Sequence, residues 1–411
     1  QIFLNSQIKM YRIINNKKIF NIFSKNYFWI FLIFLSNNVL VAQDKFSNYK
    51  KYQKTNQKIK LVEVADNLNY PWGMTFIDEE NLLVTEKNGK LFKINVKNSI
   101  KKEIKLEIQS IKFNNVKKIS SQQGGLLDVL YNNGWIYFSY SHVFKKGKID
   151  DSSSSRFSST AIARGILKNN KISNLEVLFI AKPKLISGKH FGSRMVIKDQ
   201  FIFASFGDRG LGMIAQDPEQ HPGSIIRIKT DGSLPSDNPK AKGRENWLPE
   251  IYQIGLRNPQ GMTINPENNR IYFSNHGPRG GDSIGVVNFA GNYGWKEIAW
   301  GGTEYIGTKI GKSALDNIYD EPAKIWVPSI GVGNLKFYNG KTFSDWTGDL
   351  LVTATGSKML IRINFENEKI VSEEFILKDE IGRVRDLEID VNGDVYLISD
   401  EYNSKLWKIT K

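Results

Sequence analysis

The chain has 411 residues, of which 40% are hydrophobic and 12% aromatic, so it can bury a large core in one big unit or in two to three average domains. It contains no cysteine, which excludes disulfide scaffolds, thiolate zinc sites, iron–sulfur clusters and cysteine nucleophiles. The formal net charge is +15 and there are only four histidines, so imidazole chemistry has four candidates: His142, His190, His221 and His276.

Residues 1–42 have the composition of a secretory signal peptide. They carry five basic residues and no acidic one, followed by nine apolar residues at 27–35 and a small residue, Ala42. Residues 1–9 precede Met10 and are interpreted as possible upstream read-through. A membrane-spanning helix needs about 20 apolar residues, and this run is shorter. An uncleaved segment that stays in the membrane as an anchor is the alternative interpretation. We expect a periplasmic or secreted protein whose mature net charge is about +10.

After a linker at 43–59, the rest of the chain reads as repeated strand–turn–strand units. Short apolar or alternating runs, bounded by Gly, Asn, Asp or Pro, favour strands and hairpins over helices. Asn88-Gly89 is the strongest hairpin signal among them. Six units recur, with strand centres at Val84, Phe138, Ala204, Phe273, Val352 and Leu397.

This spacing predicts an all-β fold, a six-bladed β-propeller of four-stranded antiparallel blades over residues 60–411. Residues 60–64 have no hairpin partner of their own, and we expect them to pair into the last blade and close the ring. A pair of β-sandwiches is the competing architecture. It requires a linker between two halves, and no Pro/Ser-rich break is present.

Unusual polar residues gather after the predicted strands, where propeller loops form one mouth of the channel. His190 is either a general base at neutral pH or a structural loop histidine. The planar guanidinium groups of Arg257, Arg383 and Arg385 are suited to bind the carboxylates of a ligand, or they form ion pairs between blades. The carbonyls of Gly277-Pro278 suit a hard cation such as Ca²⁺, or form a plain turn. The basic residues are spread along the chain, which argues against nucleic-acid binding.

From about Leu61 to Ile409 the chain resembles the soluble pyrroloquinoline-quinone (PQQ) sugar dehydrogenases, the glucose/sorbosone dehydrogenase family, and within it the aldose sugar dehydrogenase branch. The resemblance implies a six-bladed propeller that oxidises an aldose at C1 to a lactone and passes electrons to an external acceptor, a quinone or a cytochrome. The motifs that carry it lie at 70–74, 123–128, 190–194, 207–210, 231–233, 257–261, 276–282 and 292–295.

The resemblance also implies roles for single residues. His190 matches the general base, and Arg257 and Asn258 match residues at the quinone oxygens and the reacting centre. Gln123 matches a quinone contact, and Arg383 and Arg385 match the pair that clamps the cofactor carboxylates. Gly277 and Pro278 match the Ca²⁺ ligands, with His276 beside them. Trp326 and Ser329 match substrate-side residues. The implied cofactors are PQQ and Ca²⁺, and the implied substrate is a small sugar.

Three positions depart from the family pattern. Gly356 stands where relatives carry a lysine that reaches the quinone, and Lys358 follows two residues later. Residues 331–334 read Gly-Val-Gly-Asn, and Lys189 replaces an acid found before the base in glucose enzymes. Two alternatives therefore stay open: a catalytically silent ligand-binding propeller, and a calcium-dependent lactonase.

Overall fold

The computed structural model describes residues 46–47, 58–110, 122–144, 157–366 and 369–411. The predicted signal peptide at 1–42 and most of the linker at 43–59 lie outside the described residues. Over the described ranges the chain forms strands and three short 3-10 turns, η2 (Met213–Gln216), η3 (Pro239–Lys242) and η4 (Ser344–Trp346). None of the described helical segments has the length and apolar character needed to cross a bilayer.

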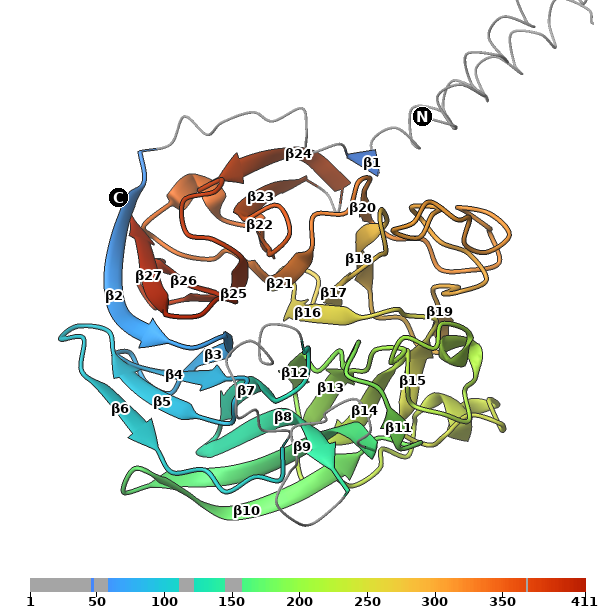
Figure 1. Ribbon diagram of the computed structural model, residues 1–411, viewed down its shortest axis with the longest axis horizontal. Helices are drawn as coiled ribbons and strands as arrows, with labels where there is room; N and C mark the ends of the chain where they lie inside the picture. The colour runs from blue at the N-terminus through green and yellow to red at the C-terminus, as the bar shows by residue number, and fades with distance from the viewer. Residues whose placement is uncertain (1–45, 48–57, 111–121, 145–156, 367–368) are drawn as a thin grey trace, which may run out of the picture. The chain divides into compact units, whose positions relative to one another are not determined.

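The strands of the unit Ser47–Lys411 form six antiparallel sheets that follow one another in chain order (Figure 1). The first contains β3 (Pro71–Phe76), β4 (Asn81–Glu86), β5 (Leu91–Asn95) and β6 (Lys101–Ile104). The second contains β7 (Leu126–Asn132), β8 (Trp135–Val143), β9 (Phe157–Lys168) and β10 (Lys171–Ile180). The third contains β12 (Met195–Lys198), β13 (Phe201–Ser205), β14 (Ile225–Lys229) and β15 (Ile251–Ile254).

The second half of the chain repeats this pattern. The fourth sheet contains β16 (Pro259–Ile264), β17 (Ile271–Asn275), β18 (Asp282–Val286) and β20 (Lys324–Trp326). The fifth contains β21 (Val332–Phe337), β22 (Leu350–Ala354), β23 (Met359–Glu366) and β24 (Lys369–Ile376). The sixth contains β25 (Val384–Ile389), β26 (Val395–Ser399), β27 (Ser404–Thr410) and β2 (Lys60–Leu68). The remaining short strands are β1 (Phe46–Ser47), β11 (Leu185–Ile186) and β19 (Gly291–Asn292).

The predicted six-bladed propeller is confirmed. Each predicted strand centre falls in the second strand of a blade, namely β4, β8, β13, β17, β22 or β26. The first strands of the blades contact one another in the order β3, β7, β12, β16, β21 and β25, and β25 contacts β3 again, which closes the ring. The predicted closure is also confirmed, because β2 pairs antiparallel with β27, with Lys60 opposite Thr410 and Leu61 opposite Ile409.

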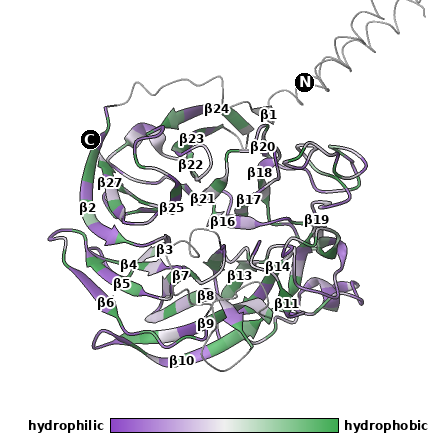
Figure 2. Ribbon diagram, in the orientation of Figure 1, coloured by the Kyte–Doolittle hydropathy of each residue, from purple (hydrophilic) through white to green (hydrophobic). Residues whose placement is uncertain are grey.

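The hydrophobic core lies between neighbouring blades rather than in one central mass. One cluster packs Ile284 and Trp326 of the fourth blade against Leu335 and Val352 of the fifth. Similar clusters fill the spaces between the other neighbouring blades. Figure 2 shows hydrophobic and hydrophilic residues interleaved along the strands, as expected where each sheet is buried on its faces and solvated at its loops. Each buried aliphatic side chain contributes about 1.5–3 kcal/mol of transfer free energy.

Candidate active site

A cavity of about 470 Å³ opens at one end of the ring. The long connection between β19 and β20 contributes Trp295, Lys296, Glu304 and Tyr305, and most other lining residues lie at or just before the first strands of blades or just after the second strands. Because these strands are antiparallel, the start of one and the end of the other meet at the same edge. The sequence prediction that polar loop residues share one mouth therefore agrees with the structure. Seven of the predicted site residues line this cavity: Gln123, His190, Arg257, Asn258, His276, Arg383 and Arg385.

His190 is held by a carboxylate that the sequence prediction did not include. Its Nδ1 atom lies 2.6 Å from Oδ1 of Asp208, and the other carboxylate oxygen of Asp208 accepts a 2.6 Å hydrogen bond from the indole of Trp295. Both His190 and Asp208 are buried. With Nδ1 donating to Asp208, the second ring nitrogen, Nε2, is the one able to accept a proton. This is the arrangement of a general base oriented by a carboxylate.

The electrostatics keep the His190 ring neutral. Burial lowers the pKa of His190, the hydrogen bond that its ring donates to Asp208 opposes this, and the nearby charges of Arg257 and Lys189 lower the pKa further. Burial opposes ionisation of Asp208 as well, but the contacts with His190, the N–H of Gly210 and Arg257 together hold the pKa of this carboxyl below its usual value. The pair is thus a neutral imidazole beside a carboxylate near pH 7.

The backbone around the pair has no room for adjustment. A Cβ added to Gly207 would lie 2.3 Å from the carbonyl oxygen of His190, so only glycine lets the two segments approach this closely. Oε1 of Gln123 accepts a 2.7 Å hydrogen bond from the backbone N–H of His190. Oδ1 of Asn258 accepts from the N–H of Gly192 at 3.0 Å. Gln123 and Asn258 therefore fix the position of the base as well as lining the cavity.

The arginines form two groups in the cavity. Arg257 donates from Nη1 to the carbonyl oxygen of His276 at 3.2 Å, and no described carboxylate forms an ion pair with it. Arg385 lies 2.5 Å from Asp400, and the partly exposed Arg383 lies 4.0 Å from the same carboxylate. The Nε atom of Arg385 is buried without a hydrogen-bond partner among the described residues. An anionic ligand would therefore find guanidinium N–H groups available.

Lys87 and Asp400 are cavity residues that the sequence prediction missed. Lys87 is 4% exposed and its Nζ lies 2.9 Å from Oδ1 of Asp400. Both follow second strands of blades, β4 and β26, and this position is the signal that could have found them. Lys358, in contrast, is exposed and does not line the cavity, whereas its neighbour Thr355 does. A buried lysine of this cavity therefore comes from the first blade, and the loop at Gly356 contributes no lysine to the lining.

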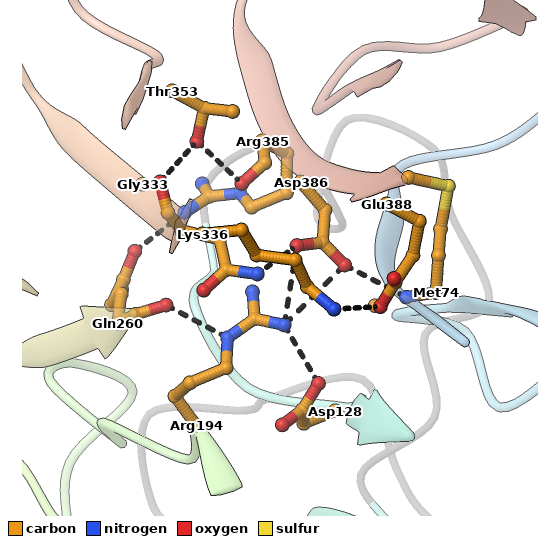
Figure 3. Close-up of polar contacts among 12 residues, drawn as sticks. Met74, Asp128, Arg194, Gln260, Gly333, Lys336, Thr353, Arg385, Asp386 and Glu388 are labelled. Atoms are coloured by element: carbon orange, nitrogen blue, oxygen red, sulfur yellow. Dashed lines mark hydrogen bonds and ion pairs between the residues drawn. The ribbon is translucent and has the colours of Figure 1, made fainter. Parts of the chain in front are cut away.

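A buried polar network lies beneath the cavity and joins all six blades (Figure 3). Oε1 of Gln260 accepts from Arg385 at 2.5 Å, and the carbonyl of Gln260 accepts from Nε of Arg194 at 2.9 Å. Nη1 of Arg194 lies 2.7 Å from Asp128 and 3.3 Å from Asp386. Asp386 also accepts hydrogen bonds from the side-chain amide of Asn334 and the backbone N–H of Met74. The network thus links the cofactor-clamp candidate Arg385 to the inner strands of every blade.

The predicted Ca²⁺ ligands offer carbonyl oxygens only. Gly277 and Pro278 are buried, and no backbone N–H of the described residues donates to either carbonyl oxygen. Nε2 of the neighbouring His276 is buried and unpartnered among those residues. No cluster of three His, Asp or Glu side chains suited to a metal occurs in the described ranges. Carbonyl oxygens are donors that Ca²⁺ accepts, but two alone fall short of its six to eight ligands.

The predicted substrate-side residues are not brought into the cavity. Trp326 is fully buried on β20, packed between the fourth and fifth blades, and its indole donates to Glu373. Ser329 does not line the cavity, and its hydroxyl accepts from the backbone N–H of Asp282 at 3.3 Å. The position of Trp326 is that of a core residue, since its apolar surface is removed from water by the neighbouring sheet.

Comparison with known proteins identifies the family. The model of the family "Glucose / Sorbosone dehydrogenase" matches residues 68–408. The aldose sugar dehydrogenase YliI of Escherichia coli K12 is 31% identical over 364 residues, which cover 86% of this chain and 93% of that protein. Quinoprotein glucose dehydrogenase B of Acinetobacter calcoaceticus is 28% identical and covers 62% of this chain and 55% of its own length.

The solved structures agree with these relatives. The apo-form crystal structure of the soluble aldose sugar dehydrogenase of Escherichia coli superimposes with a TM-score of 0.78 at 29% identity. The superposition covers 86% of this chain and 99% of that one. The similarity in fold therefore covers nearly all of that structure and most of this chain. On these grounds the chain belongs to the glucose/sorbosone dehydrogenase family.

Proposed function

We propose that this protein is a PQQ-dependent aldose dehydrogenase that oxidises the C1 hydroxyl of a sugar to a lactone. The observation that carries the proposal is the neutral His190–Asp208 pair, set in a cavity lined by more cations than carboxylates. PQQ carries three carboxylates and an electrophilic quinone, so guanidinium forks suit it. The printed name of the Acinetobacter relative, a quinoprotein, supports the same cofactor.

His190 is the residue that handles the proton. The anomeric hydroxyl gives its proton to Nε2, while Asp208 accepts a hydrogen bond from Nδ1 and stabilises the imidazolium that results. The hydrogen on C1 leaves with its electron pair, so the sugar loses two electrons and becomes the lactone. When bound, PQQ supplies the acceptor for that pair, which is chemistry that no protein side chain provides.

The other cavity residues bind and orient. Arg257, which no described carboxylate pairs, would lie at the quinone end with Asn258 and Gln123. Arg383 and Arg385 would hold cofactor carboxylates, with Asp400 and Lys87 fixing the direction of Arg385. We propose Ca²⁺ at the carbonyls of Gly277 and Pro278. Because these two supply too few ligands, water or the carboxylates of bound PQQ would supply the rest.

We also propose that the protein is exported to the periplasm or beyond and passes its electrons to an external acceptor, a quinone or a cytochrome. The basic and apolar composition of residues 1–42 supports export. Amino-terminal sequencing of the protein recovered from the producing cell tests this directly. A mature chain that begins near residue 43 supports export, and a chain that retains the apolar run contradicts cleavage.

The function is tested by reconstituting the purified protein with PQQ and Ca²⁺ and following dye reduction with a panel of aldoses. The proposal expects sugar-dependent reduction that requires both additions. PQQ binding without turnover on any aldose would instead indicate a silent binding propeller. A calcium-dependent lactonase needs free carboxylates around its ion, but the three cavity carboxylates are all engaged: Asp208 with His190, Glu304 with Lys296, and Asp400 with Lys87 and Arg385.

A further inference from the structure

The cavity lining has an excess of cationic side chains over carboxylates, and a neutral sugar carries no charge that would pair with them. Six cationic side chains line it and only three carboxylates do, Asp208, Glu304 and Asp400. The cationic residues are Lys87, Lys189, Arg257, Lys296, Arg383 and Arg385. Lys87 and Arg385 are paired by Asp400, and Lys296 is paired by Glu304 at 3.1 Å. This leaves Lys189 and Arg257 without a carboxylate partner among the described residues, while Arg383 lies 4.0 Å from the Asp400 carboxylate.

Lys189 differs from the two arginines in its place. It directly precedes the base His190, and its side chain is exposed at the cavity. Its ammonium group makes no ion pair or hydrogen bond with the described residues. A sugar that gives its proton to His190 must lie within hydrogen-bond reach of that ring, and it therefore shares the cavity with the Lys189 side chain. Arg257 and Arg383, in contrast, belong to the proposed cofactor contacts.

The backbone of Lys189 is held in place by hydrogen bonds with neighbouring residues. Its carbonyl oxygen accepts a 3.0 Å hydrogen bond from Nε of Arg209, whose side chain is buried. The guanidinium of Arg209 stacks 3.6 Å from the ring of Phe191 and also donates to the carbonyl of Ser187. The N–H of Lys189 donates to the hydroxyl of Ser187 at 3.2 Å. The starting point of the lysine side chain is therefore fixed, which reduces the entropy lost when its ammonium binds a ligand.

From these observations we propose that Lys189 forms an anion subsite for the substrate, and that the preferred sugars are aldoses carrying a carboxylate or phosphate, such as uronic acids. This inference rests on the proposed dehydrogenase function and narrows its substrate class. The anionic group pairs with the Lys189 ammonium while the C1 hydroxyl faces His190. A point charge on a flexible stem suits anions of more than one shape, so both carboxylate and phosphate belong in the test.

The experiment compares the wild-type protein with Lys189→Gln, both loaded with PQQ and Ca²⁺. The measured quantity is the ratio of kcat/KM for glucuronate, or for glucose 6-phosphate, to kcat/KM for glucose. We expect the ratio to fall about tenfold in Lys189→Gln, the scale of one lost charge-assisted hydrogen bond. Lys168→Gln, an exposed lysine at the end of β9 outside the cavity, is the matched control and should keep the wild-type ratio.

Two further readings separate a charge effect from a structural one. In wild type the preference for the anionic sugar should shrink as ionic strength rises, whereas Lys189→Gln should show little salt dependence. Calorimetric binding of gulonate, which keeps the C6 carboxylate of glucuronate but has no anomeric hydroxyl, should weaken in Lys189→Gln, and binding of glucitol should not. An anionic-to-neutral ratio that is the same in both proteins overturns the subsite while the dehydrogenase stands. If no aldose, neutral or anionic, reduces the dye, the proposed function itself fails.

Discussion

The Nδ1 atom of His190 lies 2.6 Å from Oδ1 of Asp208, which joins the segment before β12 to the segment after β13 of the same blade. A single antiparallel pair of strands thus delivers both the base and the carboxylate that orients it. The close approach depends on Gly207, because any side chain there would meet the carbonyl of His190.

His190→Ala should lower kcat/KM for aldose oxidation by about 100-fold or more, because the proton of the anomeric hydroxyl loses its acceptor. The measurement is dye reduction at saturating PQQ and Ca²⁺. His142→Ala, a half-buried histidine outside the cavity, serves as the matched control and should retain most activity. Equal losses in the two variants would show that His190 is not the base.

Asp208→Asn should move the acid limb of the pH profile to lower pH. The limb arises because protonated His190 cannot accept a proton, so activity falls as the pH drops through the pKa of His190. Burial already holds that pKa below its ordinary value of 6.5, and the hydrogen bond and charge of Asp208 raise it. Removing the charge therefore lowers the pKa further, and kcat should also fall because the ring is no longer oriented.

The matching measurement is a titration of the His190 ring by NMR in wild type and Asp208→Asn. It reports the pKa without turnover. A pKa that rises in the variant would contradict the electrostatic assignment made here.

Arg385→Gln should weaken PQQ binding by about 10- to 100-fold, the range expected for one or two charge-assisted hydrogen bonds to a carboxylate. The dissociation constant is measured by equilibrium dialysis of PQQ against the purified protein. Arg362→Gln is the control, since Arg362 pairs with Asp349 and Glu374 outside the cavity. An unchanged dissociation constant in Arg385→Gln would remove Arg385 from the cofactor site.

Arg194→Met should destabilise the fold by about 3–5 kcal/mol, because it leaves Asp128 and Asp386 buried without their partner. The free energy of unfolding is measured by urea denaturation. Lys97→Met breaks the exposed pair with Glu80 and should cost at most about 1 kcal/mol.

The cost of Arg194→Met should depend on pH in a defined direction. Burial raises the pKa of Asp128 to about 7 although Arg194 opposes the shift, so loss of the arginine raises this pKa further above its unfolded value. Protonation at low pH then relieves the penalty, so the loss of stability should be smaller at pH 5 than at pH 8. A loss that grows toward low pH would show that the two aspartates are not the groups left uncompensated.

Deleting residues 1–68 should cause aggregation, whereas deleting residues 1–59 should not. The longer deletion removes β2 and leaves the edge of β27 unpaired, and exposed strand edges pair with other chains. Size-exclusion chromatography of the two proteins measures the outcome. A monodisperse, fully folded 1–68 deletion would show that ring closure by β2 is dispensable.

The sequence by itself determined the fold and the outline of the cavity. The alternation of apolar and polar residues, the turn residues and the six-fold recurrence of strand units are local patterns. They can be recognised in the sequence without knowledge of distant contacts. The polar residues after strand ends could be assigned to one mouth because antiparallel pairing places them there. His190, Arg257, Arg383 and Arg385 were found in this way and lie together in the structure.

Only the tertiary structure decided which groups act on one another. Asp208, Lys87 and Asp400 each follow a second strand, which marks them as cavity residues but does not name their partners. The partner of Asp208 comes from the segment before the neighbouring strand of the same blade, and Lys87 meets Asp400 only where the ring closes. Trp326 resembled a substrate residue, yet the packing of two blades encloses it. A cavity assembled from segments of all six blades depends on closure of the ring, and no short stretch of sequence encodes the distances across it.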